Sequence, residues 1–213
     1  MILTKMTAVG TDGSRVTLWF DDGTRMKLST DIVVRQGLYQ GMDISEDALG
    51  ELQEAAQKAS AKDRAVRIVS ATSISEQELK RRLVQRGERP EDAAQAVDWL
   101  KELGAVDDGA MAKRVVSRCV EKGYGASRIR QELYQKGIPR EYWEEALSAV
   151  PDMGNAIDAF LKKRLRGQAP DKKELKRVTD ALARRGHSWG DIRAALLRYQ
   201  ADLDLEDDGW DGI

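Results

Sequence analysis

The feature that most restricts the fold of this chain is a short motif that occurs three times, about fifty residues apart. Residues 83–87 are LVQRG, residues 133–137 are LYQKG, and residues 182–186 are LARRG. Each copy has a leucine four residues before a glycine and a basic residue directly before that glycine. A regular spacing of this size indicates a chain that is built from repeated structural units.

Apolar side chains recur at matching distances from the three glycines, Gly87, Gly137 and Gly186. Positions eight and four before the glycine share one helical face, and so do positions six, ten and thirteen after it. Each copy therefore predicts a helix, a tight turn and a second helix, with the glycine in the left-handed conformation that ends the first helix. The matched residues are Leu79, Ile129 and Val178; Leu83, Leu133 and Leu182; Ala93, Trp143 and Ile192; Ala96, Ala146 and Ala195; Val97, Leu147 and Leu196; and Leu100, Val150 and Tyr199.

A further helical stripe of apolar residues precedes each helix pair, so the predicted unit has three helices and occurs three times over residues 61–200. The stripes are Ala65, Ile68, Val69 and Thr72; Ala112, Val115, Val116, Cys119 and Val120; and Ile157, Phe160, Leu161 and Leu165. Local signals agree with this division. Ser75 with Glu78 predicts a capping box, Ser188 with Asp191 resembles one, and Pro90 suits the first position of a helix.

The first thirty residues have a different pattern. ILTKMTAV, RVTLWF and TRMKLS alternate like strands, and GTDGS and DDG between them favour hairpins. We also expect a helical turn at residues 31–37 and a helix that Ser45 caps and that runs from Glu46 towards Lys58.

The expected fold is mainly α, with three tandem three-helix repeats in an elongated curved array and a small N-terminal antiparallel β-hairpin region. The expected divisions are a β-rich extension (1–45), a linking helix with the first repeat (46–107), the second repeat (108–153), the third repeat (154–200) and an acidic disordered tail (201–213).

Motifs for catalysis or cofactor binding are absent from the sequence. There is no phosphate loop, HExxH motif or GxGxxG motif. Cys119 lies in an apolar stripe and is expected to be a buried structural thiol rather than a nucleophile, and His187 is expected to be a turn residue. Asp107 and Asp108 precede a helix, so we favour N-capping over a metal pair. We predict no enzyme activity, no catalytic residue, no metal and no cofactor.

The single cysteine, the lack of a signal-peptide pattern and the lack of a long apolar run together predict a cytoplasmic protein with no membrane partner. The net charge of −1 conceals opposed blocks along the chain. Residues 155–200 contain 12 cations and 5 anions, whereas residues 201–213 contain 6 anions and no cation. Such blocks favour a surface that faces a polyanion, although each alone is compatible with an ordinary solvated face.

Basic residues gather around the repeated glycines and at the end of one further helix. Those directly before the glycines, Arg86, Lys136 and Arg185, also complement the helix dipole, which is a structural role. We expect the whole set to form a surface for a partner or for DNA, without base-specific recognition. The set is Lys80, Arg81, Arg82, Arg86, Arg128, Arg130, Lys136, Lys162, Lys163, Arg164, Arg166, Lys172, Lys173, Lys176, Arg177, Arg184 and Arg185.

Four ordered segments resemble the RecX family, regulators of the RecA recombinase. They are SEQELKRRLVQRG, LKELGAVDDGAMA, GYGASRIRQELYQKGIP and LARRGHSWGDIRAAL, and the resemblance covers about residues 60–200. It differs from the family pattern at Ala105 and Met111, where aromatic residues are usual. Both positions are expected to pack in the core. The N-terminal hairpins resemble an extension of some longer members.

The resemblance implies three tandem three-helix repeats and a monomer that binds the RecA filament along its groove. It also implies that the protein blocks or disassembles the filament and so restrains strand exchange, ATP hydrolysis and the SOS response. Weak, non-specific contact with single- and double-stranded DNA would accompany this. Two alternatives stay open: a non-sequence-specific DNA-binding repeat protein without a recombinase partner, and a scaffold for some other protein.

Overall fold

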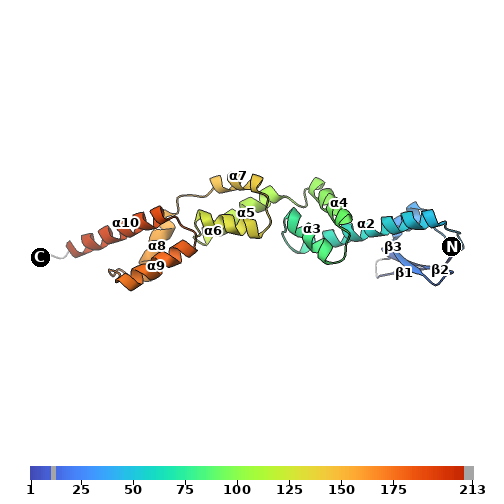
Figure 1. Cartoon of the computed structure of the whole chain (residues 1–213), viewed down its shortest axis with the longest axis horizontal. Coiled ribbons are helices and arrows are strands. Elements are labelled where there is room, and N and C mark those ends of the chain that lie inside the picture. Colours follow the sequence, from blue (N-terminus) through green and yellow to red (C-terminus); the bar gives the residue numbers. More distant parts are fainter. Residues whose placement is uncertain (11–12, 209–213) are drawn as a thin grey trace. The chain divides into compact units, whose positions relative to one another are not determined.

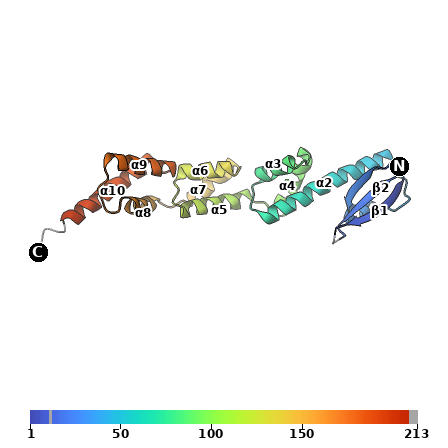
Figure 2. The ribbon, with the colours of Figure 1, turned by 90° about the horizontal axis from the view of Figure 1, so that it is seen from below.

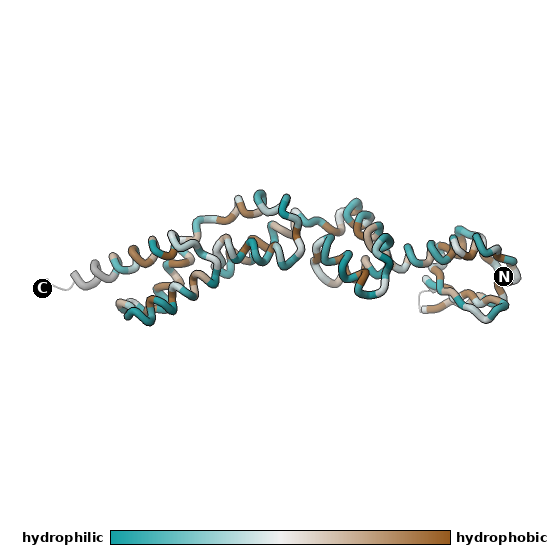
Figure 3. Tube along the Cα trace, viewed as in Figure 1, coloured by the Kyte–Doolittle hydropathy of each residue, from teal (hydrophilic) through white to brown (hydrophobic). Residues whose placement is uncertain are grey.

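The computed structural model describes residues 1–10 and 13–208 and divides into two compact units, the second of which begins at Asp107. Most of the described residues are helical, and the β-structure lies in the first unit (Figure 1). Along the helices, hydrophobic and hydrophilic segments alternate, as expected where one face of each helix is buried (Figure 3). The mainly α fold with three-helix repeats and a small N-terminal antiparallel sheet is confirmed.

The sheet has three antiparallel strands in sequential order, joined by short turns. In β2, Val16, Leu18 and Phe20 are buried while Trp19 is partly exposed, so one face is apolar. This face packs against the helical turn α1 and the first half of α2, which runs beside the sheet in Figure 2. The elements are β1 (Leu3–Val9), β2 (Arg15–Phe20), β3 (Arg25–Ser29), α1 (Thr30–Arg35) and α2 (Glu46–Ala71).

Helix α2 is longer than the sequence pattern suggested. Its N-cap is Ser45, as predicted, and the Ser45 hydroxyl accepts a hydrogen bond from the backbone nitrogen of Ala48 at 3.2 Å. The helix does not stop near Lys58, because no glycine or proline follows Gly50 before it ends. Its first half belongs to the sheet's core and its second half to the first repeat, so the linking helix and the first repeat helix are one element.

The first repeat consists of the second half of α2 with α3 and α4, which lie against it (Figure 1). Its core includes Leu79, Leu83, Ala96 and Leu100, all at predicted positions. Ala105 was expected in this core and is exposed instead. The chain turns after α4 so that the next residue, Val106, takes the buried position. The helices are α3 (Glu76–Gln85) and α4 (Pro90–Glu102).

The second repeat packs three helices and a short 3₁₀ turn around one core. Leu133 and Ile129 are fully buried, and Met111 and Cys119 are buried beside them as expected. The last helix is short, and the indole nitrogen of Trp143 donates to the carbonyl of Ile138 at 2.9 Å, which closes the end of the core. The elements are α5 (Asp108–Glu121), α6 (Ala126–Gln135), η1 (Arg140–Tyr142) and α7 (Trp143–Ser148).

The third repeat has the same arrangement, with longer second and third helices, around a core that includes Leu161, Leu182 and Ile192. Residues 201–208, the first part of the predicted tail, continue α10. No glycine or proline interrupts the chain between Gly190 and Gly209, so nothing local ends the helix earlier. Residues 209–213 of the predicted tail lie outside the described residues. The helices are α8 (Gly154–Leu165), α9 (Lys172–Arg184) and α10 (Trp189–Asp208).

The three repeated glycines have the predicted backbone conformation. The φ angles of Gly87, Gly137 and Gly186 are 91°, 68° and 86°, in the left-handed region that L-residues with side chains rarely adopt. Each follows the last turn of its helix, and its backbone nitrogen donates back to a carbonyl of that turn. The repeat therefore rests on the same helix-ending turn in all three copies.

Candidate partner-binding surface

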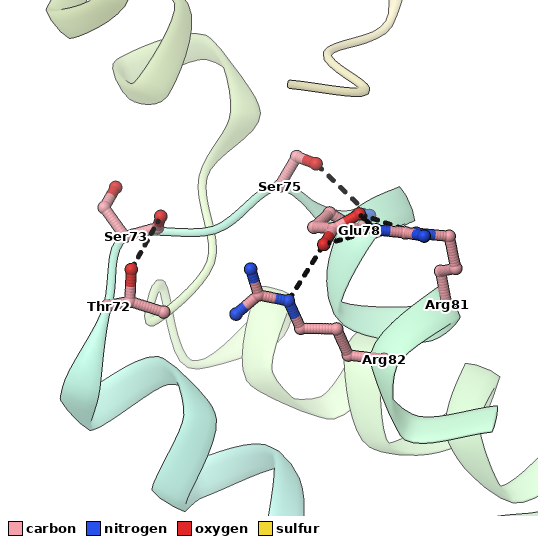
Figure 4. Close-up of polar contacts among 6 residues, drawn as sticks. All are labelled: Thr72, Ser73, Ser75, Glu78, Arg81 and Arg82. Atoms are coloured by element: carbon pink, nitrogen blue, oxygen red, sulfur yellow. Dashed lines mark hydrogen bonds and ion pairs between the residues drawn. The ribbon is translucent and has the colours of Figure 1, made fainter. Parts of the chain in front are cut away.

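The basic residues of the first repeat are partly neutralised by an acid on the same helix. The Glu78 carboxylate accepts hydrogen bonds at 2.8 Å from Arg81 and from the Nε of Arg82, as Figure 4 shows. Burial alone would raise the pKa of Glu78, but these hydrogen bonds outweigh burial and lower it. Lys80 and Arg86 are exposed and have no ion-pair partner among the described side chains. The accessible charge of this helix is thus smaller than its sequence suggests.

In the second repeat, one predicted cation has a structural role. Arg128 is half-buried, forms an ion pair with Glu132 at 2.7 Å, and lies over the ring of Tyr124 at 5.8 Å. Such a guanidinium is held by its own chain and offers little to a partner. Arg130 and Lys136 are exposed.

Among the predicted cations, most of those that remain accessible belong to the third repeat, although two of its members are engaged. Lys162 pairs with Asp202 of α10 at 3.2 Å, and the Arg185 guanidinium lies 4.7 Å from the centre of the Phe160 ring. The other eight are exposed, and none pairs with an acid among the side chains that the structure describes. They are Lys163, Arg164, Arg166, Lys172, Lys173, Lys176, Arg177 and Arg184.

A backbone junction between the second and third repeats was not predicted. The nitrogen of Gly125 donates to the carbonyl of Arg185 at 2.9 Å, and that of Ser127 donates to the carbonyl of Gly186 at 3.2 Å. A Cβ on Gly125 would overlap Gly186, and a Cβ on Gly186 would overlap the backbone of Arg128. Only glycine allows this approach, so the segment GYG before α6 and the turn after α9 form one contact that sets how these two repeats meet.

His187 completes this junction. It lies in the turn, as predicted, but is only 8% exposed, and its Nε2 lies 3.0 Å from the carbonyl of Gly123. Because a carbonyl can only accept, Nε2 carries the proton of the neutral imidazole. The side chain is therefore a structural donor between two repeats.

We expect the stability of this unit to fall in mild acid. Burial lowers the pKa of His187, and this outweighs the Gly123 hydrogen bond and Asp191, which raise it. The folded chain therefore binds this proton more weakly than the unfolded chain, whose histidine has a pKa of about 6.5. Stability should be constant well above that pH and fall as the pH drops below it.

The comparison is between wild type and His187→Gln, which removes the only histidine of the chain. Denaturant titrations at about pH 7.5 and about pH 5.5 should show that the advantage of wild type over the variant shrinks in acid. An advantage of equal size at both pH values would contradict the assigned role.

The remaining reactive residues occupy structural positions. Burial raises the pKa of the Cys119 thiol, which keeps it protonated inside the second repeat's core. The Asp107 carboxylate caps α5 by accepting from the backbone nitrogen of Ala110 at 2.8 Å, as expected, and Asp108 is buried. No group of three or more potential metal ligands occurs within residues 1–10 and 13–208. In the same part of the chain, no helix combines the length and apolar character needed to span a membrane.

An apolar groove of about 550 Å³ lies between α9 and α10. Leu175, Trp189 and Leu196 line it, and Lys172 and Lys176 belong to its rim. Trp189 is 67% exposed. Trp189 was not among the predicted site residues, although its place outside the repeated apolar positions indicates exposure. The groove can accept apolar groups of a partner while cations contact acidic groups beside it.

These features define a class of protein, a series of three-helix repeats with exposed cations and an apolar groove in its third repeat. The family model described as "RecX, second three-helix domain" matches residues 107–147. The Regulatory protein RecX of Chromohalobacter salexigens is 33% identical over 141 residues, which cover 66% of this chain and 93% of that protein. The Clostridioides difficile protein of the same name is 29% identical over 201 residues, which cover 92% of this chain and 94% of that protein. The chain belongs to the RecX family.

Solved structures agree with the fold. A crystal structure of regulatory protein RecX has a TM-score of 0.68 at 22% identity and covers 91% of this chain and 98% of its own. The crystal structure of RecX from Lactobacillus salivarius has a TM-score of 0.59 at 19% identity and covers 71% of this chain and 99% of its own. The first alignment extends over nearly the whole chain, so the fold as a whole is shared.

Proposed function

We propose that this protein regulates the RecA recombinase by binding in the groove of the RecA–DNA filament, where it limits filament growth, ATP hydrolysis and strand exchange. The observation that carries the proposal is similarity over almost the full length to relatives named Regulatory protein RecX, such as that of Clostridioides difficile. The link to RecA is a property that the family resemblance implies.

The physical route requires no catalysis. Tandem repeats present side chains from successive helices to a long partner. The eight unpaired cations of the third repeat would meet acidic recombinase residues or DNA phosphates, and the groove beside Trp189 would take apolar side chains of the partner. Occupying the filament groove excludes a second DNA molecule, and bridging neighbouring subunits alters their exchange. The protein would act in the cytoplasm as a monomer.

The second candidate is a DNA-binding repeat protein that acts without a recombinase. The same unpaired cations favour it, because exposed Lys and Arg side chains bind phosphates non-specifically. It predicts strong binding to free DNA with a steep salt dependence, whereas the first candidate predicts weak binding to single- and double-stranded DNA alone.

Sedimentation separates the two candidates. The protein is mixed with single-stranded DNA and a non-hydrolysable ATP analogue, with and without RecA, and the filaments are sedimented. We expect sedimentation to depend on RecA, because the proposed site is the filament. In parallel, sub-stoichiometric protein should lower DNA-dependent ATP hydrolysis by RecA.

The controls are DNA without RecA and RecA without DNA. Equal sedimentation with DNA alone would favour the second candidate. Unchanged ATP hydrolysis and unchanged strand exchange at equimolar protein would contradict the proposal.

A further inference from the structure

A small polar pocket of about 310 Å³ lies in the third repeat where α8 ends and α9 begins. Three arginines line it, Arg164 and Arg166 from the end of α8 and Arg177 from the second turn of α9. In the sequence, Arg164 and Arg166 lie beside Lys162 and Lys163. The structure instead groups them with Arg177, more than ten residues further along the chain.

The positive charge of this pocket is only partly compensated, because three arginines and a single carboxylate, that of Glu174, line it. Within the described part of the chain no acid pairs with Arg164, Arg166 or Arg177, whereas Arg82, Arg128 and Arg198 each have a carboxylate partner. The acid that lines the pocket, Glu174, is already used in the capping box of α9: its carboxylate accepts from the backbone nitrogen of Asp171, whose own side chain accepts in return. Three neighbouring guanidinium groups repel one another unless an anion lies between them.

The backbone under the pocket is held in an unusual conformation. Arg166 has φ 54° and ψ 38° and is the one non-glycine residue with positive φ among the residues described. A left-handed conformation costs a residue with a side chain about 1–2 kcal/mol, and glycine is usual at such a helix end. The turn is secured by hydrogen bonds from the nitrogen of Gln168 to the carbonyl of Leu165 at 3.1 Å and from the Tyr199 hydroxyl to the carbonyl of Gln168 at 3.1 Å.

The arrangement suits a phosphate group. Guanidinium groups match the oxygens of phosphate in pairs and bind them through charge-assisted hydrogen bonds. Lys163, Lys172 and Lys173 are exposed on the neighbouring turns of α8 and α9. Cations that continue beyond the pocket favour a chain of phosphates over a single free one.

We propose that the pocket of Arg164, Arg166 and Arg177 binds a phosphodiester group of a DNA backbone. The inference rests on the proposed function only where it places the pocket in a RecA–DNA filament. There the pocket would hold the bound DNA strand. Binding to free DNA tests the pocket separately. The contact carries no base specificity, because it reaches only the phosphate.

The test variant is the full chain with Arg164→Gln, Arg166→Gln and Arg177→Gln. The matched control is Arg25→Gln, Arg67→Gln and Arg118→Gln, three exposed arginines outside both the pocket and the groove between α9 and α10 that have no ion-pair partner among the described side chains. Both change the net charge by the same amount. Binding to an oligothymidylate single strand and to a duplex of equal length is measured between about 50 and 200 mM salt.

We expect the pocket variant to bind DNA about ten-fold or more weakly at the lowest salt, and the control to lose much less. On the single strand, the slope of log affinity against log salt should flatten by about 0.7 if the arginines share one phosphate, and by up to about 2 if they contact successive ones. The duplex arm shows which form of DNA the pocket prefers.

A third variant, with lysine at all three positions, keeps the charge but loses the paired geometry. The slope of its log affinity against log salt should stay that of wild type, while its affinity for DNA falls. It also serves if the glutamine variant fails to fold, which circular dichroism detects.

Equal weakening by the pocket variant and the control would overturn the inference, and so would a wild type that binds no free DNA. Unchanged DNA binding with weaker sedimentation on RecA filaments would assign the pocket to an acidic protein surface instead. A pocket variant that loses free-DNA binding yet still lowers ATP hydrolysis by RecA would support the pocket and the proposed function separately.

Discussion

Replacing Gly186 with alanine is expected to lower the free energy of unfolding of the second unit by about 3–5 kcal/mol. Two causes act together. Gly186 has φ 86°, which an alanine adopts only with strain. The new methyl group would also overlap backbone atoms of Arg128, which cannot move without separating the two repeats and breaking the hydrogen bonds of Gly125 and Ser127.

Gly87→Ala is the matched control. Gly87 has the same place in the first repeat and φ 91°, but no atom lies within 4 Å of the position its Cβ would take. The control should cost only the conformational strain, about 1–2 kcal/mol. Denaturant titrations of the full chain measure both changes. Equal losses in the two variants would show that the close approach at Gly186 contributes nothing to stability.

Leu133→Ala is expected to cost about 2–5 kcal/mol, because it leaves a cavity in a packed core. Leu133 is fully buried and lies among residues of α5, α6 and α7, so its neighbours belong to three helices that cannot all close the gap.

The adjacent residue offers a control, since Tyr134 is 69% exposed on the same helix. Tyr134→Ala should change the free energy of unfolding by no more than about 0.5 kcal/mol. If Leu133→Ala were equally mild, the assignment of the repeated leucine to the core would be wrong.

Much of the fold could be predicted because its signals are local. The leucines at 83, 133 and 182 are fully buried, and the glycines that follow them adopt the predicted conformation. Helical periodicity and the left-handed turn are properties of a few consecutive residues. Because the chain repeats both signals three times, they predict three copies of the same unit. The short strands at the N-terminus were predictable for the same reason.

The sequence was a poor guide where burial or helix length depended on the surroundings of a residue in the folded chain. Ala105 carries an apolar methyl, yet the turn after α4 exposes it and buries Val106. The end of α10 is acidic, a composition that suggested disorder, and the structure describes it as helix up to Asp208. The composition of a segment indicates the conformation that it prefers in isolation. Contacts with the rest of the folded chain determine which residue is buried and where a helix ends.

The repeated three-helix unit, the turns that end its helices and most residues of its cores follow from the amino-acid sequence alone. Which cations remain available depends on tertiary packing. It pairs Lys162 with Asp202 and places Arg185 on Phe160, and it brings Arg177 to Arg164 and Arg166. These contacts join residues from different helices, so they depend on how the helices pack. The spacing of residues along one helix does not predict that packing.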